Sequence, residues 1–147
     1  GLSLRQFLEA VAKRFTVAPC SGPVSLVTGT IAMYSPAGWH QLAWTPDQCA
    51  PPAERLDVAV LQQRLLDPIL GIHDPRTSAR IEFVGGVLGT AELERRVNSG
   101  LAAVAFALPP VTAEQLMAIA DAGGILPPKS TWFEPKLRSG LFVHTFD

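Results

Sequence analysis

One short segment near the end of the chain concentrates the residue types that bind anions. It reads PPKSTWFEPKLRSG over residues 127–140 and contains two lysines and three hydroxyl side chains. A lysine ammonium suits phosphate or carboxylate oxygens, and hydroxyl groups can hydrogen-bond to the same oxygens. Prolines restrict the backbone and hold neighbouring side chains at low entropic cost. We therefore interpret the segment as a candidate anion site made of Lys129, Ser130, Thr131, Lys136 and Ser139.

A second interpretation of this segment is structural. Trp132 and Phe133 are adjacent large apolar side chains that could close a core or anchor an interface with another chain. The lysines and hydroxyl groups would then belong to a solvated loop. Residue types alone do not decide between an anion site and a packing or docking element.

The other residue types that do chemistry are scattered. His40, His73 and His144 include no pair four residues apart on an expected helix, so we predict no metal site. The glycines of FVGGVLGTAEL join an expected strand to an expected helix, where backbone N–H groups can hold an anion. Without G-x-G-x-x-G or a P-loop lysine, a glycine turn required for tight packing is the favoured interpretation.

The two cysteines, Cys20 and Cys49, lie in proline-flanked segments, and neither has a C-x-x-C partner. This spacing does not favour zinc. A disulfide would require their Cα atoms to lie within ~7 Å of each other, which a sequence does not show. We expect two reduced thiols, as is usual in the cytoplasm.

Composition limits the classes of function. Hydrophobic residues make up 48% and charged residues 17% of 147 residues, which favours one folded domain over residues 1–147. The net charge of −1 and the lack of a basic stripe disfavour a nucleic-acid partner. No run approaches the ~20 apolar residues that cross a bilayer, and the N-terminal pattern is not that of a signal peptide. We therefore expect a cytoplasmic protein with no membrane partner.

Periodicity and end signals predict four helices. The first and last begin with capping boxes, Ser3 with Gln6 and Thr112 with Gln115. The helix within LDVAVLQQRLLDPILGI is expected to have Asp57 as its N-cap, a kink or restart at Pro68 and an end at Gly71. The helix within TAELERRVNSG is expected to be capped by Thr90 and stopped by Gly100.

Apolar and β-branched runs predict the strands. Val24–Tyr34 and Trp39–Trp44 should form an antiparallel hairpin that places Trp39 and Trp44 on opposite faces. Ala79–Gly86 and Leu101–Leu108 flank a helix, and the second is apolar enough to be buried on both faces, which predicts a parallel right-handed crossover. Residues 140–146 are expected to form a last strand. The predicted fold class is α+β, with a mixed β-sheet, an N-terminal antiparallel hairpin, a βαβ unit and helices packed on the sheet.

Three stretches resemble one known family. ILPPKSTWFEPKLRSGLFVH is similar to the ending M-P-x-K-S-T-Y-F-x-P-K-x-x-S-G-L of the bacterial and archaeal domain-of-unknown-function 1015 family, with Trp132 where Tyr is usual. LDVAVLQQRLLDPILGI and AFALPPVTAEQLMAIADAGGILPPKST resemble patterns that lie upstream of that ending. The resemblance covers most of the chain from about Leu56 onward, whereas the first third matches loosely, chiefly at MYSPAGWHQL.

The resemblance implies that this chain is the C-terminal portion of a longer protein, and Gly1 in place of an initiating Met agrees with an excised piece. Family members carry an Asp-Gly-His-His-Arg-type motif in an N-terminal half, and this chain has no match to it. That motif is similar to a signature of ParB- and sulfiredoxin-like nucleotide enzymes. By this distant analogy the implied function is kinase-like, with a nucleotide as the candidate cofactor.

Under that analogy, residues 129–139 would complete a site for a phosphorylated ligand, a nucleotide or another small anionic metabolite, facing the missing N-terminal half. The alternative is a non-catalytic docking or dimerisation domain. Its partner would be the N-terminal half of the same protein or a second copy of the chain, with Trp132 and Phe133 at the interface.

Overall fold

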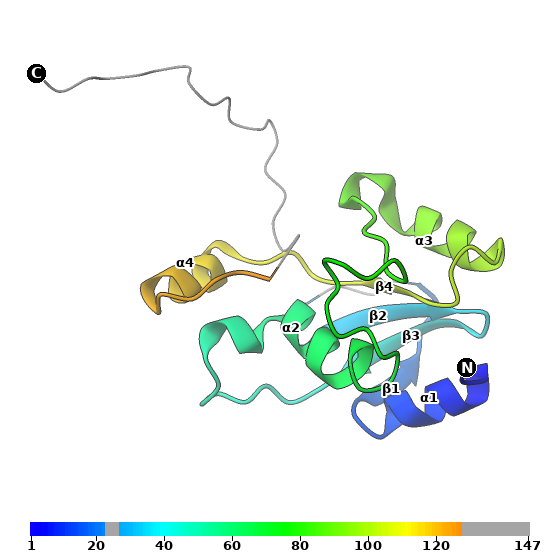
Figure 1. The fold of residues 1–147 in the computed structure, drawn as a ribbon, viewed down its shortest axis with the longest axis horizontal. Helices are drawn as coiled ribbons and strands as arrows, with labels where there is room; N and C mark the ends of the chain where they lie inside the picture. Colours follow the sequence, from blue (N-terminus) through cyan, green and yellow to red (C-terminus); the bar gives the residue numbers. More distant parts are fainter. Residues whose placement is uncertain (23–26, 128–147) are drawn as a thin grey trace, which may run out of the picture.

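The fold belongs to the α+β class, as predicted, and consists of a four-stranded sheet with helices packed against it (Figure 1). The computed structural model describes residues 1–22 and 27–127. The strand order in the sheet is β1-β3-β2-β4, and every neighbouring pair is antiparallel. The strands are β1 (Thr16–Pro19), β2 (Thr30–Ser35), β3 (Gly38–Ala43) and β4 (Ala105–Ala107).

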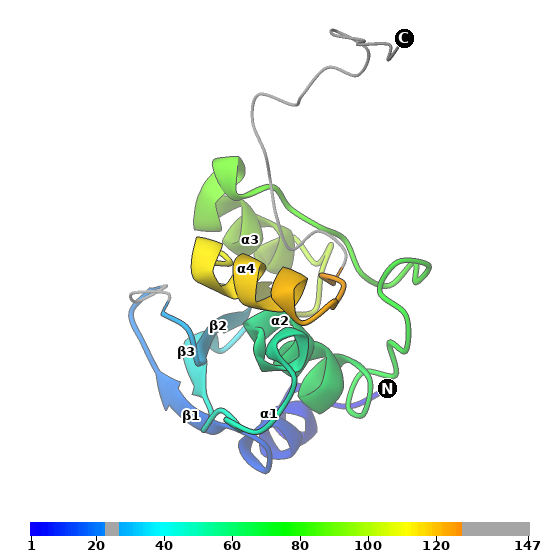
Figure 2. The same ribbon diagram turned by 90° about the vertical axis from the view of Figure 1, so that its left-hand side faces the viewer.

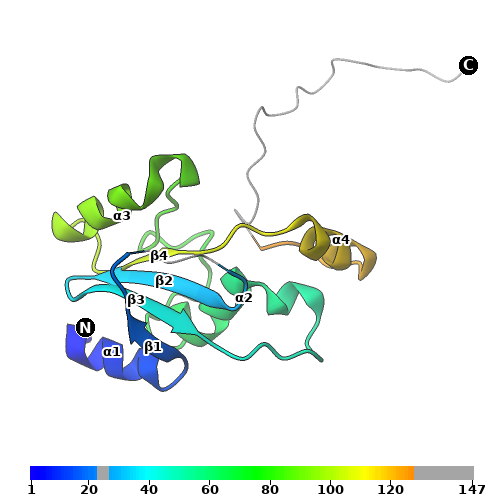
Figure 3. The same cartoon turned by 180° about the vertical axis from the view of Figure 1, so that it is seen from behind.

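Helices cover both faces of this sheet. α1 lies on one side and α3 on the other, as the view from behind shows (Figure 3). α2 packs on β2, whereas α4 lies beside α2 and contacts the short helix η1 (Figure 2). The helical elements are α1 (Leu4–Ala12), the 3₁₀-helix η1 (Pro52–Arg55), α2 (Asp57–Leu61), the π-helical turn η2 (Gln62–Leu66), the 3₁₀-helix η3 (Gly86–Leu88), α3 (Gly89–Asn98) and α4 (Ala113–Asp121).

The predicted central hairpin is confirmed. Its alternating side chains lie on opposite faces of the sheet. Ile31 pairs with Leu42 on the face covered by α1 and α2, and both are fully buried. Trp39 lies on the other face under α3, where its Nε1–H donates a 2.8 Å hydrogen bond to Glu94. Trp44 packs edge-on against Phe15 with ring centroids 6.0 Å apart. The two tryptophans therefore face opposite sides of the sheet, as their odd spacing predicts.

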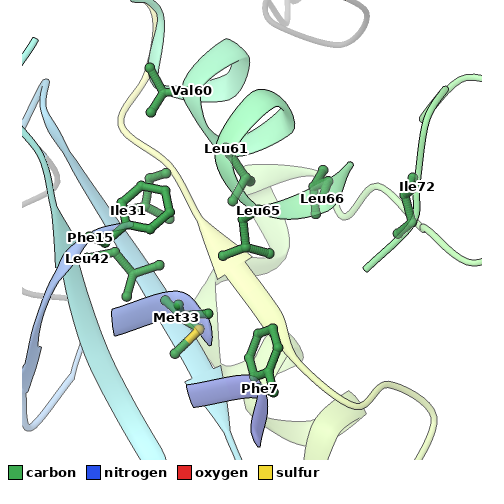
Figure 4. Packing of buried hydrophobic residues seen from close by; sticks show 11 residues of the cluster. Phe7, Phe15, Ile31, Met33, Leu42, Val60, Leu61, Leu65, Leu66 and Ile72 are labelled. Carbon is green, nitrogen blue, oxygen red and sulfur yellow. The ribbon is translucent and has the colours of Figure 1, made fainter. Parts of the chain in front are cut away.

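The core lies between the sheet and the layer formed by α1, α2 and η2 (Figure 4). Strand alternation supplies one side of it, and the three-four spacing of apolar residues on the helices supplies the other. Burial of these side chains is the main favourable term that holds the helices on the sheet. The cluster contains Phe7, Val11, Phe15, Ile31, Met33, Leu42, Val60, Leu61, Leu65, Leu66 and Ile72.

The ends of α1, α3 and α4 follow the local sequence. Both predicted capping boxes are confirmed, at Ser3 with Gln6 and at Thr112 with Gln115. α3 and α4 each end in a left-handed glycine, Gly100 at φ +76° and Gly123 at φ +66°. Around each glycine, backbone N–H groups bond to carbonyls three and five residues earlier, the hydrogen bonds of a Schellman motif.

The predicted mixed sheet and βαβ unit are wrong in the described part of the chain. Residues 79–86 form no strand, and Phe83 is 47% exposed there. Without that strand there is no parallel partner for β4, which instead pairs antiparallel with β2. The segment 101–108 yields only the three residues of β4, all half-buried rather than buried on both faces. Local apolar patterning does not specify which segment reaches the sheet edge.

Two further strand features differ from the predictions. β2 begins at Thr30 rather than Val24, and residues 23–26 lie outside the described ranges. β1 was not predicted, because its four residues include a proline and lie next to a loop-like sequence. Pro19 is tolerated because β1 is an edge strand. The predicted strand at 140–146 lies outside the described residues.

Two predicted helix caps are wrong. Asp57 is the first residue of α2, with Leu56 as its N-cap, and its carboxylate bonds to another segment of the chain. Thr90 lies inside α3, which begins at Gly89 without a side-chain cap. The helical run after Asp57 also ends at Leu66, ahead of Pro68, instead of kinking there.

Candidate functional site

The anion site and the interface that the sequence predicts lie outside the described residues. This applies to Lys129, Ser130, Thr131, Lys136 and Ser139, and equally to Trp132 and Phe133. Their arrangement therefore stays a prediction.

A different pocket is formed between the connection that follows β3 and the helical layer. Its volume is ≈ 150 Å³. Trp44 contributes to its wall, together with charged residues of both signs. The lining residues are Trp44, Pro46, Asp47, Ala50, Glu54, Arg55, Val60, Gln63 and Arg64. We call this the Trp44 pocket.

The connection side of the Trp44 pocket is shaped by a local turn at Asp47. The Asp47 carboxylate accepts a 2.9 Å hydrogen bond from the N–H of Cys49, and the Asp47 carbonyl accepts the N–H of Ala50 at 3.3 Å. An aspartate side chain that accepts a backbone N–H two residues later stabilises a turn at the expense of a helix or strand. Pro51 and Pro52 then lead into η1, since proline fixes φ near a helical value at the first position of a helix. The chain is thereby folded back toward α2.

The helical side of the Trp44 pocket follows from residue spacing. Leu56 is buried beneath the start of α2 and fixes this end of the helix. Val60, Gln63 and Arg64 are three and four residues apart, so they share one face of the helical run. Gln63 and Arg64 belong to the π-helical turn η2, a geometry that is rare and often found at functional sites.

The arginines of the Trp44 pocket differ from several others in the chain. Arg76, Arg95 and Arg96 each form an ion pair with a carboxylate. Arg55 and Arg64 are half-buried, and neither forms an ion pair or side-chain hydrogen bond with any described residue. A partly desolvated guanidinium without an anion is an unfavourable arrangement that an added anion would relieve.

The indole of Trp44 adds a second unsatisfied donor. Its Nε1 is shielded from solvent and has no acceptor among the described residues. A buried donor left without a partner costs about 1–3 kcal/mol. Because this atom is shielded from solvent, the donors open to a ligand in the pocket are those of the two arginines, which is the chemistry of a site for an anionic ligand.

A buried carboxylate supports the wall that carries Trp44. Asp57 is 7% exposed and accepts a 2.8 Å hydrogen bond from the N–H of Gly29, whose own carbonyl accepts the N–H of Trp44 at 3.4 Å. Gly29 has φ +91°, which favours glycine at this position. Burial raises the pKa of Asp57 from its ordinary value, while the hydrogen bonds from Gly29 and from its own backbone oppose that rise. Asp57 therefore positions the backbone at Trp44 rather than lining the pocket.

A second polar cluster surrounds His73. Its Nδ1 pairs with Asp67, and the amide of Gln62 donates to the carbonyls of Ile72 and His73 at 2.7 and 3.3 Å. The His73 side chain is 83% exposed, so water competes for its interactions. Within residues 1–22 and 27–127, no three His, Cys, Asp or Glu side chains lie together as metal ligands would.

The remaining sequence candidates have ordinary surroundings. Gly89 has φ +67°, which accounts for glycine at the start of α3. A Cβ added at Gly85, Gly86 or Gly89 would meet nothing within 4 Å, so the tight packing expected there is absent. Cys20 is half-buried, Cys49 is exposed, and both are free thiols, as predicted.

Comparisons with known proteins give no relatives for this chain. No family model, curated protein or solved structure matches it. The resemblance to the domain-of-unknown-function 1015 family is therefore neither supported nor opposed. Among the described helices, none has the length and apolar character that a bilayer crossing requires.

Sequence reasoning missed the Trp44 pocket because its lining residues, all between residues 44 and 64, meet only when the connection after β3 folds back against the helical run. Trp44 had been noted only for its orientation, and Arg55 and Arg64 form no motif with it. The sequence feature that could have indicated the pocket is the connection TPDQCAPPAER, in which prolines and charged residues are interspersed. Rigid backbone that carries charge next to a tryptophan is a pattern worth testing as a pocket wall.

Proposed function

We propose that this chain is a binding domain for a small anionic metabolite and forms part of a cytoplasmic enzyme. The observation that carries the proposal is the pair of arginines in the Trp44 pocket, which have no anionic partner among the described residues. A volume of ≈ 150 Å³ admits a molecule of about benzene size, so the candidate ligand is a small metabolite. Arginine forks bind carboxylate and phosphate oxygens in pairs, which supplies both affinity and orientation.

The sequence segment 129–139 supports the same ligand class by its composition. Lys129 and Lys136 would offset charge on phosphoryl oxygens, and neighbouring hydroxyl groups would hydrogen-bond to them. Under the family resemblance, this segment faces an N-terminal half with kinase-like chemistry, and a nucleotide is the candidate cofactor. The Trp44 pocket and segment 129–139 would then bind different parts of the metabolite and the nucleotide.

The test is ligand binding by calorimetry with inorganic phosphate, pyrophosphate, ATP and malate. We expect one of these to bind the chain, and we expect Arg64→Gln to weaken that binding about 10- to 100-fold, the loss of one charged hydrogen bond of ~1.5–3 kcal/mol. Arg5→Gln is the matched control, since Arg5 is exposed on α1 and lies outside the pocket. Equal binding by wild type and Arg64→Gln would contradict a role for the pocket.

Lys129→Ala separates the two candidate sites. If segment 129–139 contributes to the same ligand, this variant also weakens binding, while its melting temperature without ligand stays that of wild type. If only Arg64→Gln has an effect, the Trp44 pocket binds without that segment.

The alternative function is docking, and one observation favours it. Phe83, Val87 and Leu88 are exposed by 47%, 85% and 60% on the segment that precedes α3. Clustered exposed apolar side chains often mark protein–protein contacts. In this proposal the partner is the N-terminal half or a second copy of the chain, and Trp132 and Phe133 are interface anchors.

Sedimentation of the chain at increasing concentration tests the docking proposal. A dimer that dissociates in Trp132→Ala, with an unchanged circular dichroism spectrum, would support it. A monomer at all concentrations that also fails to bind the N-terminal half would exclude it.

A further inference from the structure

The charges around the Trp44 pocket are of both signs and equal in number. Arg55 and Arg64 contribute two positive charges, and Asp47 and Glu54 contribute two negative charges. A site built only for an anion gains from an excess of positive charge, because nearby carboxylates repel the ligand at short range. The balanced lining therefore needs a further explanation.

These opposite charges do not neutralise one another. In the described part of the chain, no ion pair joins either arginine to Asp47 or Glu54. The Asp47 carboxylate is held on the connection by the N–H of Cys49 at 2.9 Å, while Arg64 is carried by η2. Two different backbone segments thus present the two kinds of charge separately to one cavity.

The size of the cavity limits what can bridge them. A cavity of about 150 Å³ accommodates a molecule of roughly benzene size. The Trp44 pocket has ≈ 150 Å³, so it matches a compact metabolite, and a whole nucleotide would extend well beyond it.

We infer that the ligand of the Trp44 pocket is a small zwitterion of the α-amino-acid class. Its carboxylate or phosphate is held by Arg55 and Arg64, and its ammonium group by Asp47 and Glu54. The inference rests on the proposed function, because it names the ligand class of the same pocket. It accounts for the coexistence of both signs of charge without ion pairs between them.

The experiment compares ligands that differ only by an ammonium or a hydroxyl group. The pairs are L-aspartate with L-malate, L-serine with glycerate, and O-phospho-L-serine with 3-phosphoglycerate, titrated into the full chain by calorimetry. In at least one pair we expect the ammonium compound to bind tenfold or more tightly. The double variant Asp47→Asn/Glu54→Gln should abolish that preference, and it should bind the hydroxyl compound at least as tightly as wild type does, because two carboxylates that repel an anion have been removed.

This double variant suits the test because Asn at 47 still accepts the N–H of Cys49, so the turn is retained. Glu9→Gln is the control, since Glu9 lies on α1 outside the pocket. Equal affinities within every pair, or a preference that persists in the double variant, would overturn the zwitterion assignment and leave anion binding standing. No binding by any of these compounds, by phosphate or by pyrophosphate would overturn both proposals.

Discussion

At the scale of single residues, the most consequential side chain outside the pocket is Asp57. Its carboxylate is buried between the start of α2 and the turn before β2, where it accepts the N–H of Gly29. The group is costly to ionise there, and yet its oxygen is required as an acceptor. Charge and hydrogen bonding at this position can therefore be separated by substitution.

Asp57→Ala should lower the free energy of unfolding by about 1–3 kcal/mol, because it leaves the N–H of Gly29 without its acceptor. Asp57→Asn keeps an acceptor oxygen and removes the buried charge, so it should be close to wild type at neutral pH or more stable. Urea unfolding of the three proteins checks this. A loss in Asp57→Asn as large as in Asp57→Ala would show that the charge itself is stabilising.

The pH dependence of the same variants has a definite sign. The pKa of Asp57 is raised above 3.8, so the folded state binds more protons than the unfolded chain between 3.8 and the folded pKa. The contribution of Asp57 to stability therefore falls as pH rises through this range. Asp57→Asn should remove that fall, and the difference in unfolding free energy between the two proteins should grow in favour of Asn as pH rises above 3.8.

At the scale of elements, α3 is attached to the sheet mainly by polar contacts. Its Glu94 accepts the indole N–H of Trp39 at 2.8 Å, and the amide oxygen of Asn98 accepts the hydroxyl of Tyr34 at 3.2 Å. Val97 is the one fully buried residue of this helix. Within the helix, Glu92 forms ion pairs with Arg95 and Arg96, and Arg96 also pairs with Glu82 of the preceding segment. Two side-chain hydrogen bonds thus join α3 to the sheet, whereas α1 is held by its buried apolar residues Phe7 and Val11.

The stability of α3 should accordingly decrease at acidic pH. Hydrogen bonds from Arg95 and then Arg96 lower the pKa of Glu92 from 4.5 to about 2. This stabilisation is complete above pH 4.5 and is lost as pH falls from 4.5 toward 2. In Glu92→Gln the decline in melting temperature over that range should be shallower than in wild type. Glu9→Gln on α1 is the control, and identical pH profiles for wild type and Glu92→Gln would contradict the prediction.

At the scale of the whole molecule, stability is distributed unevenly. The core joins α1, β2, β3 and the α2–η2 run, whereas α4 buries only Ile119 and contacts η1. Regions with few buried apolar contacts open at lower free energy than the core. Because η1 ends at Arg55, opening of α4 would also loosen one side of the Trp44 pocket.

Hydrogen exchange should distinguish the less stable α4 from the more stable core. Amides of α4 should exchange well before those of β2 and β3. Ile119→Ala should speed exchange in α4 and η1, because it removes the one buried side chain of α4, while protection in the sheet should persist. Equal protection of α4 and the central strands would show that the described residues open as one unit.

The sequence by itself determined the features that depend on neighbouring residues. Capping boxes at Ser3 and Thr112, the glycine end at Gly100, and the opposite orientations of Trp39 and Trp44 follow from contacts within a few positions. The α+β class could also be predicted, from alternating and helical apolar periods. The predicted anion site at 129–139 lies outside the described residues and stays a prediction of the sequence.

Only the tertiary structure decided the pairing of β4 with β2, the addition of β1 at the other edge, and the loss of the strand expected at 79–86. Sheet pairing depends on which segments reach an open edge, and local propensity carries little of that information. The same holds for the Trp44 pocket, whose lining residues all lie between residues 44 and 64. They surround one cavity only because the connection after β3 folds back against the helical run that carries Val60, Gln63 and Arg64.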